Sequence, residues 1–154
     1  MTIDYIVSSL PALVFGAPAP LTRERFIELC GAAWADRVEP ILRGAWAELD
    51  VQLRNATAEA RGGERFCRPT SACSLYWKGR IQACFQETDV LRREELLDRV
   101  RWEAAGELTP PASPLGVEAL ATYAVRLEIA LKHDRISRTD GNAAFDRLTA
   151  ETRR

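Results

Sequence analysis

Apolar side chains recur every three or four residues through one long stretch of this chain, and this spacing constrains the fold more than any other feature. The stretch steps by 4, 3, 4 and 3 through Leu42, Trp46, Leu49, Leu53 and Ala56. An α-helix places residues at these intervals on one face, and such a face must be covered by other parts of the protein. Pro40 suits the first turn of this helix, and Gly62-Gly63 suits its end. The stretch therefore predicts a helix packed into a core.

Four other segments show helical periodicity over shorter distances. Their inward-facing residues are Phe26, Cys30, Ala33 and Trp34 in the first segment, Leu75, Ile81 and Phe85 in the second, Leu97, Val100, Ala104 and Leu108 in the third, and Val117, Leu120, Ala124, Leu127 and Leu131 in the fourth. Thr22 and Asp89 can cap the first and third helices with their side-chain oxygens. Ser113 is the predicted cap of the fourth helix, with Pro114 in its first turn.

The remaining segments complete the predicted architecture. Segment 64–86 allows only a short helix, which Gly79 weakens. A turn at Asp140-Gly141 precedes a short C-terminal helix that carries Phe145 and Leu148. Together the patterns predict an all-α fold, a bundle of about five helices. It forms a single domain over residues 1–154, with an internal proline loop at 110–114.

The N-terminus has a different pattern. Residues 3–7 alternate loosely and are rich in β-branched side chains, which predicts a short strand. Prolines and a glycine then interrupt any regular structure, so residues 1–20 are predicted to form an extended N-terminal arm. Four apolar residues are expected to hold the arm against the domain: Leu10, Leu13, Val14 and Phe15.

Composition and charge exclude several classes of protein. Hydrophobic residues make up 47% of the 154 residues, which is typical of a globular protein. The 21 basic and 22 acidic residues nearly balance, which argues against a nucleic-acid-binding protein. Only Lys78 and Lys132 are lysines, and arginine suits protein contacts because its planar group pairs with carboxylates. The sequence contains no apolar stretch of the ~20 residues that a transmembrane helix needs, so we expect a cytoplasmic protein without direct membrane insertion.

The sequence carries no recognisable catalytic motif. His133 is the only histidine, which excludes a His-rich metal site, and it lies near a predicted helix end where its charge would interact with carbonyl groups. Gly62-Gly63 follows a helix rather than a strand, and no phosphate-binding motif follows it. We therefore expect no catalytic residue, no cofactor and no enzymatic activity.

The four cysteines are Cys30, Cys67, Cys73 and Cys84. Structural zinc sites usually contain a close pair of thiols, and the spacings of 6 and 11 among the last three lack one. We expect buried apolar thiols and no bound zinc. A metal or redox site that uses Cys67, Cys73 and Cys84 is the alternative.

The third helical segment alternates acidic and basic side chains. Its acidic residues are Glu94, Glu95, Asp98 and Glu103, and its basic residues are Arg92, Arg93, Arg99 and Arg101. Such mixing is typical of a solvated helix face with ion pairs four residues apart. Trp102 lies off the inner face of this segment, and two positions are open to it: beneath the proline loop or at a protein interface.

Several stretches resemble a bacterial family of unknown function whose members are typically encoded beside subunits of V/A-type rotary ATPases. The resemblance lies in 5–16 and 26–30, in Leu53-Arg54-Asn55-Ala56 with Arg61, in 96–103 around Arg101 and Trp102, and in 123–129 with Gly141 and Phe145. The family is distantly similar to the C-type subunit of these ATPases, called d in eukaryotic enzymes. That subunit is a helical adaptor between the rotary shaft and the membrane ring.

The resemblance implies a non-catalytic accessory or central-stalk component of a bacterial V/A-type rotary ATPase, an enzyme class that transports protons or sodium ions. Its partners would be ATPase subunits of the central stalk or the membrane ring, which would bring the chain to the periphery of the inner membrane. The candidate protein-contact residues are Arg54, Asn55, Arg61, Arg101, Trp102 and Tyr123. Each of them could instead make contacts within the chain. The alternative functions are a free-standing helical adaptor and a small thiol- or metal-dependent enzyme or sensor.

Overall fold

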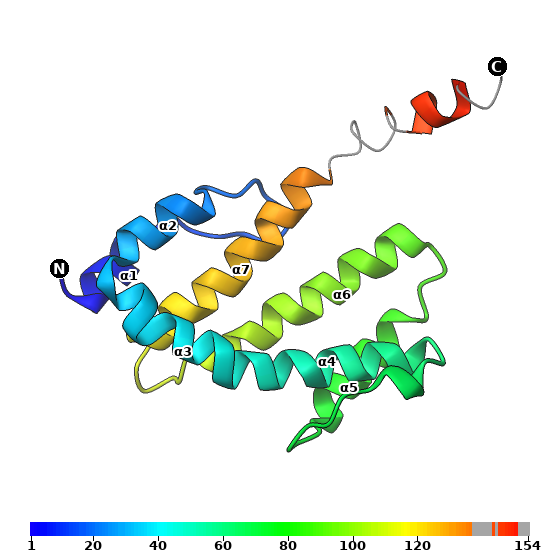
Figure 1. Cartoon of the computed structure of the whole chain (residues 1–154), viewed down its shortest axis with the longest axis horizontal. Coiled ribbons are helices and arrows are strands. Elements are labelled where there is room, and N and C mark those ends of the chain that lie inside the picture. Colours follow the sequence, from blue (N-terminus) through cyan, green and yellow to red (C-terminus); the bar gives the residue numbers. More distant parts are fainter. Residues whose placement is uncertain (137–142, 144, 151–154) are drawn as a thin grey trace.

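The computed structural model describes residues 1–136, 143 and 145–150, and these contain helices but no β-strand (Figure 1). The all-α prediction is therefore confirmed. In chain order the main helices are α1 (Ile3–Ser9), α2 (Arg23–Cys30), α4 (Ala47–Ala60), α5 (Leu75–Cys84), α6 (Val90–Ala105) and α7 (Val117–Arg135). Short 3-10 turns follow α4 at Glu64–Phe66 and α6 at Gly106–Leu108.

The predicted N-terminal strand is wrong, because Ile3–Ser9 forms helix α1. A strand needs a neighbouring strand for its backbone hydrogen bonds, and the described chain offers none, whereas a helix satisfies its own. Ile6 is buried, and α1 packs against α7. The extended arm predicted over 1–20 is therefore correct only for the segment after α1, in which Leu10, Leu13 and Phe15 pack against the core and Val14 is exposed.

One continuous helical segment leads into α4, and Pro40 lies inside it rather than at its start. The segment contains the widened π-helical turns η1 (Trp34–Val38) and η2 (Leu42–Trp46), with α3 (Glu39–Ile41) between them. In η1 the N–H of Glu39 binds the carbonyl of Trp34. Proline lacks the N–H that an α-helix interior requires, and the widened turns on both sides accommodate it. The predicted helix start at Pro40 is therefore wrong.

The predicted helix caps have mixed outcomes. The side chains of Thr22 and Asp89 accept hydrogen bonds from backbone N–H groups of α2 and α6, as predicted. Gly62 has a φ of 76° just beyond α4, which confirms its role at the helix end. The predicted cap at Ser113 is wrong, because a turn occupies 113–116 and α7 begins after Gly116 without a side-chain cap.

The core consists of three apolar clusters. Helix α6 lies between α7 on one side and α4 and α5 on the other. The first cluster joins α1, α2 and η1 to α7, and Leu120 lies at its centre. The second joins α4, α5 and α6 around Leu53. The third joins α6 to α7 and the arm around Trp102. The stripes of α4 and α6 therefore bury together as predicted, whereas most of the α4 stripe lies in a different cluster from the α7 stripe.

In this arrangement α4 diverges from α7 (Figure 1). Helices α6 and α7 are antiparallel neighbours, and the segment that ends in α4 contacts α7 mainly through η1 and α3 (Figure 1). Beyond α3 the segment diverges from α7 and packs mostly on α5. Within the part of the chain that the structure describes, no helix combines the length and apolarity needed to span a membrane.

The C-terminal prediction is only partly covered by the described residues. Residues 143 and 145–150 are helical, and the side chains of Phe145 and Leu148 are exposed. The turn predicted at Asp140-Gly141 lies outside the described residues.

Candidate docking groove

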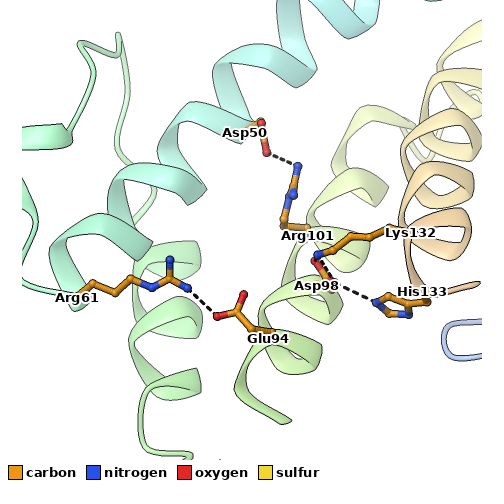
Figure 2. A network of polar contacts seen from close by, with 7 residues as sticks. All are labelled: Asp50, Arg61, Glu94, Asp98, Arg101, Lys132 and His133. Atoms are coloured by element: carbon orange, nitrogen blue, oxygen red, sulfur yellow. Dashed lines mark hydrogen bonds and ion pairs between the residues drawn. The ribbon is translucent and has the colours of Figure 1, made fainter. Parts of the chain in front are cut away.

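Asp50 on α4 joins two of the candidate contact residues. Its Oδ2 accepts a hydrogen bond from Nε of Arg54, 2.7 Å away and one turn along the same helix. Its Oδ1 accepts a hydrogen bond from Nη2 of Arg101 on α6, 2.8 Å away (Figure 2). The Asp50 side chain is 13% exposed, whereas that of Arg54 is 65% exposed. Asp50 therefore ties α4 to α6 and orients one solvent-accessible guanidinium group.

Arg61, the residue that ends α4, bridges the other end of the same two helices. Its Nη2 donates to Oε1 of Glu94 on α6 at 2.6 Å (Figure 2). Its guanidinium carbon also lies 5.9 Å from the ring centroid of Phe85. Arg61 and Glu94 are both about half exposed, and exposed ion pairs of this kind contribute only ~0–1 kcal/mol to stability.

Asp98 joins α6 to α7 through a buried carboxylate. Its side chain is 8% exposed and accepts hydrogen bonds from Nζ of Lys132 at 2.9 and 2.7 Å. Nε2 of His133 lies 3.0 Å from the same carboxylate (Figure 2). A buried carboxylate is costly unless it is paired, and these two groups supply the pairing. His133 does lie near the end of α7, but its partner is Asp98 rather than the predicted carbonyl groups.

Four charged residues of α6 form ion pairs with other helices or their ends. Glu94 and Asp98 bind Arg61 and Lys132, as described, and Glu103 binds Arg80 of α5 at 2.5 Å. Arg101 binds Asp50. The predicted ion pairs four residues apart within this helix are therefore wrong for the described residues, whereas Arg92, Glu95 and Arg99 are exposed, as a solvated face predicts. Helix α6 is surrounded by α4, α5 and α7, so its charges meet partners on those neighbours.

Asn55 on α4 binds the loop that leads from α4 to α5. Its Nδ2 donates to the carbonyl oxygen of Arg68, and its Oδ1 accepts from the N–H of Arg68, each at 2.8 Å. A side-chain amide that pairs with both backbone groups of one residue fixes the position of that residue. The structure thus gives Asn55 a partner within the chain.

Trp102 and Tyr123 hold the N-terminal arm. Trp102 is 9% exposed and meets the ring of Phe15 edge to face, with ring centroids 5.5 Å apart. It therefore packs beneath the arm and not beneath the proline loop. The hydroxyl of Tyr123 donates to the carbonyl of Pro11 at 2.9 Å, and its ring stacks on Phe26. Burial raises the pKa of Tyr123 to about 12.

Two adjoining hollows open between α4 on one side and α6 and α7 on the other. Their volumes are about 640 and 560 Å³, and Arg54, Arg101 and Lys132 line both. We call the two together the groove. The basic residues that line it are Arg23, Arg54, Arg61, Arg68, Arg101, Lys132 and Arg135, and the acidic residues are Asp50, Glu94, Asp98 and Glu128.

The groove combines apolar surface with an excess of positive charge. The apolar side chains with accessible surface include Val51 and Phe66 in the first hollow and Leu42 and Trp46 in the second. Seven basic and four acidic residues give it a formal charge of +3, although the whole chain has a net charge of −1. Apolar surface with arginine at its edge is characteristic of protein-binding sites. The groove brings Arg54, Arg61 and Arg101 together, whereas Trp102 and Tyr123 lie outside it.

The cysteines do not gather around a metal site in the described part of the chain. No group of three or more histidine, cysteine, aspartate or glutamate side chains there is placed to hold a metal ion. Cys30 and Cys84 are buried, and burial raises the pKa of Cys30 to about 11. Cys67 is half-buried, with its Sγ 3.6 Å from the carbonyl oxygen of Asn55, and Cys73 is exposed.

Sequence reasoning missed three residues that shape the groove: Asp50, Asp98 and Lys132. The spacing of four between Asp50 and Arg54 is a helical ion-pair signal that could have identified the first. Asp98 and Lys132 are 34 residues apart, so no local pattern links them.

Comparison with protein-family models, with curated protein sequences and with solved structures gives no significant match to this chain.

Proposed function

We propose that this protein works by docking onto another protein through the groove, as an accessory or central-stalk component of a bacterial V/A-type rotary ATPase. The observation that carries the docking proposal is the groove itself, which opens to solvent between three helices and combines apolar side chains with an excess of basic residues. The ATPase as the partner rests on the resemblance of Leu53-Arg54-Asn55-Ala56 and the other stretches to the ATPase-associated family. The role requires no catalytic residue, metal or cofactor.

Arg54 and Arg61 are the residues best suited to test this proposal. Both line the groove and are more than half exposed, and each forms an ion pair within the chain. Both arginine side chains are solvent-accessible, and Asp50 keeps its pair with Arg101 when Arg54 is removed, so each loss costs the fold only ~0–1 kcal/mol. An arginine desolvated in an interface can contribute ~2 kcal/mol or more to binding. The double variant Arg54→Ala/Arg61→Ala therefore separates docking from folding.

The experiment is a pull-down of ATPase subunits from the native cell with the full chain, accompanied by thermal melts. We expect the double variant to recover far less ATPase than the wild type while its melting temperature stays close to that of the wild type. Arg25→Ala/Arg43→Ala is the matched control, because these arginines are also exposed and paired along their helices but lie outside the groove.

Two results would contradict the proposal. A large drop in melting temperature would assign Arg54 and Arg61 to the stability of the bundle. If the wild type recovers no ATPase subunit under gentle conditions, the ATPase role fails, and a free-standing helical adaptor becomes the better description.

A further inference from the structure

We infer that the groove accepts an acidic amphipathic helix of a partner protein, with the apolar face of that helix against the groove floor and its carboxylates on the groove arginines. The inference deepens the proposed function, since it rests on docking through the groove and adds the chemistry of the docked element. It does not depend on which protein carries the helix.

The shape of the groove suits a helix. One wall is α4, whose 14 residues extend for about 20 Å. The opposite wall is formed by α6 and α7, and the floor includes partly buried apolar side chains that line the groove, Leu42, Trp46 and Val51. The two hollows share Arg54, Arg101 and Lys132, so they are contiguous, and both are open to solvent. A helix laid in such a groove buries side chains at every third or fourth position.

The charge of the groove selects an acidic partner. Its formal charge of +3 lies within a chain of net charge −1, so the positive charge is local to this surface. Complementary charge on a partner speeds association and excludes cationic competitors. A second copy of the chain is a poorer occupant, because its own groove is equally cationic and would face the first across a symmetric interface.

The arginines retain donors for such a partner. A guanidinium group has five N–H donors, and Arg54 forms its one ion pair among the described residues through Nε. Arg61 uses Nη2 alone in its ion pair with Glu94. Asp50 and Glu94 thus orient these side chains without saturating them. Partner carboxylates could add charge-assisted hydrogen bonds while the internal pairs remain.

The test uses the full chain and a designed helical peptide of about 18 residues, with leucine along one face and glutamate along both flanks. A matched peptide carries lysine in place of every glutamate. Binding is followed by nuclear magnetic resonance of the indole N–H groups. Trp46 lines the groove, whereas Trp77 is buried in the second cluster and bonded to Glu107, which makes Trp77 the internal control.

We expect the glutamate peptide to shift the Trp46 signal and leave the Trp77 signal in place. It should bind at least about tenfold more tightly than the lysine peptide, and added salt should weaken its binding. Arg54→Glu/Arg61→Glu should weaken it by about tenfold or more, because two attractions become repulsions. The control Arg25→Glu/Arg43→Glu should bind like the wild type.

Three outcomes would overturn the inference: equal binding of both peptides, binding of neither, or self-association of the chain in sedimentation equilibrium that Arg54→Glu/Arg61→Glu abolishes. The last would assign the groove to a second copy. Peptide binding without recovery of ATPase subunits in the pull-down would keep the acidic-helix inference and remove only the ATPase. Recovery of those subunits without peptide binding would keep the ATPase as the partner and remove the acidic-helix inference.

Discussion

At the residue scale, the hydroxyl of Tyr123 links the N-terminal arm to α7. It donates to the carbonyl of Pro11, and a phenolate in its place could not donate and would be desolvated by burial. Folding therefore favours the neutral form, and the pKa rises from 10.0 to about 12. A raised folded-state pKa means that this contribution to stability is complete below pH 10 and is lost as the pH rises toward 12.

We predict that Tyr123→Phe lowers the free energy of unfolding by about 0.5–1.5 kcal/mol at pH 8, because one hydrogen bond is lost. Between pH 10 and 12 the wild type should lose stability more steeply than the variant, which lacks the ionising group. Urea denaturation at pH 8, 10 and 11 measures both effects. Tyr5→Phe is the control, since Tyr5 is exposed. Parallel pH profiles for the wild type and Tyr123→Phe would contradict the assignment.

At the scale of elements, polar side chains of α4 hold the irregular loop between α4 and α5. Three polar residues on α4, spaced by four and three, bind the loop: Glu48, Gln52 and Asn55. Glu48 accepts hydrogen bonds from Thr70 and Ser71, and these bonds lower its pKa. The loop thus obtains its backbone partners from a helix face rather than from regular structure of its own.

We predict that Asn55→Ala frees the loop locally while changing the melting temperature of the domain only slightly. The variant loses both hydrogen bonds to the backbone of Arg68, and tryptic cleavage after Arg65 should accelerate several-fold because proteolysis follows local opening. Gln82→Ala, at an exposed position on α5, is the control. Unchanged cleavage rates would show that the amide does not hold the loop.

At the scale of the whole molecule, shared side chains connect the three apolar clusters. Trp46 packs against both the second and the third cluster, and Leu42 packs against the first and the third. These two residues lie on one continuous helical segment, so neither end of the bundle can lose its packing without affecting the other. Cooperative unfolding in a single transition follows from this sharing.

We predict that Leu53→Ala in the second cluster and Leu120→Ala in the first each cost about 2–5 kcal/mol, because both side chains are fully buried. Both should lower the midpoint of the same transition in differential scanning calorimetry, and the calorimetric and van't Hoff enthalpies should agree. Leu115→Ala, at an exposed site, should leave the midpoint nearly unchanged. Two separate transitions, each moved by only one variant, would contradict the prediction.

The sequence predicted the features that depend on neighbouring residues, namely helix positions and helix caps. Helical spacing located the stripes of α4, α6 and α7, and Thr22 and Asp89 marked two helix starts, because capping acts within one turn. The same reasoning failed at 3–7, where loose alternation suggested a strand and the absence of a pairing strand left a helix. It failed again at Pro40, where two widened turns let a helix continue through a proline.

The candidate site depended on contacts between distant residues. From the sequence alone, the charges of α6 indicated pairing along their own helix. Tertiary packing placed Asp50 beside Arg101, 51 residues away, and Asp98 beside Lys132, 34 residues away. Side-chain spacing within a helix is set by backbone geometry over four residues, so the sequence by itself determined the helices that carry a clear apolar stripe. The groove arises where three of those helices diverge, and only their packing decided which charges face it.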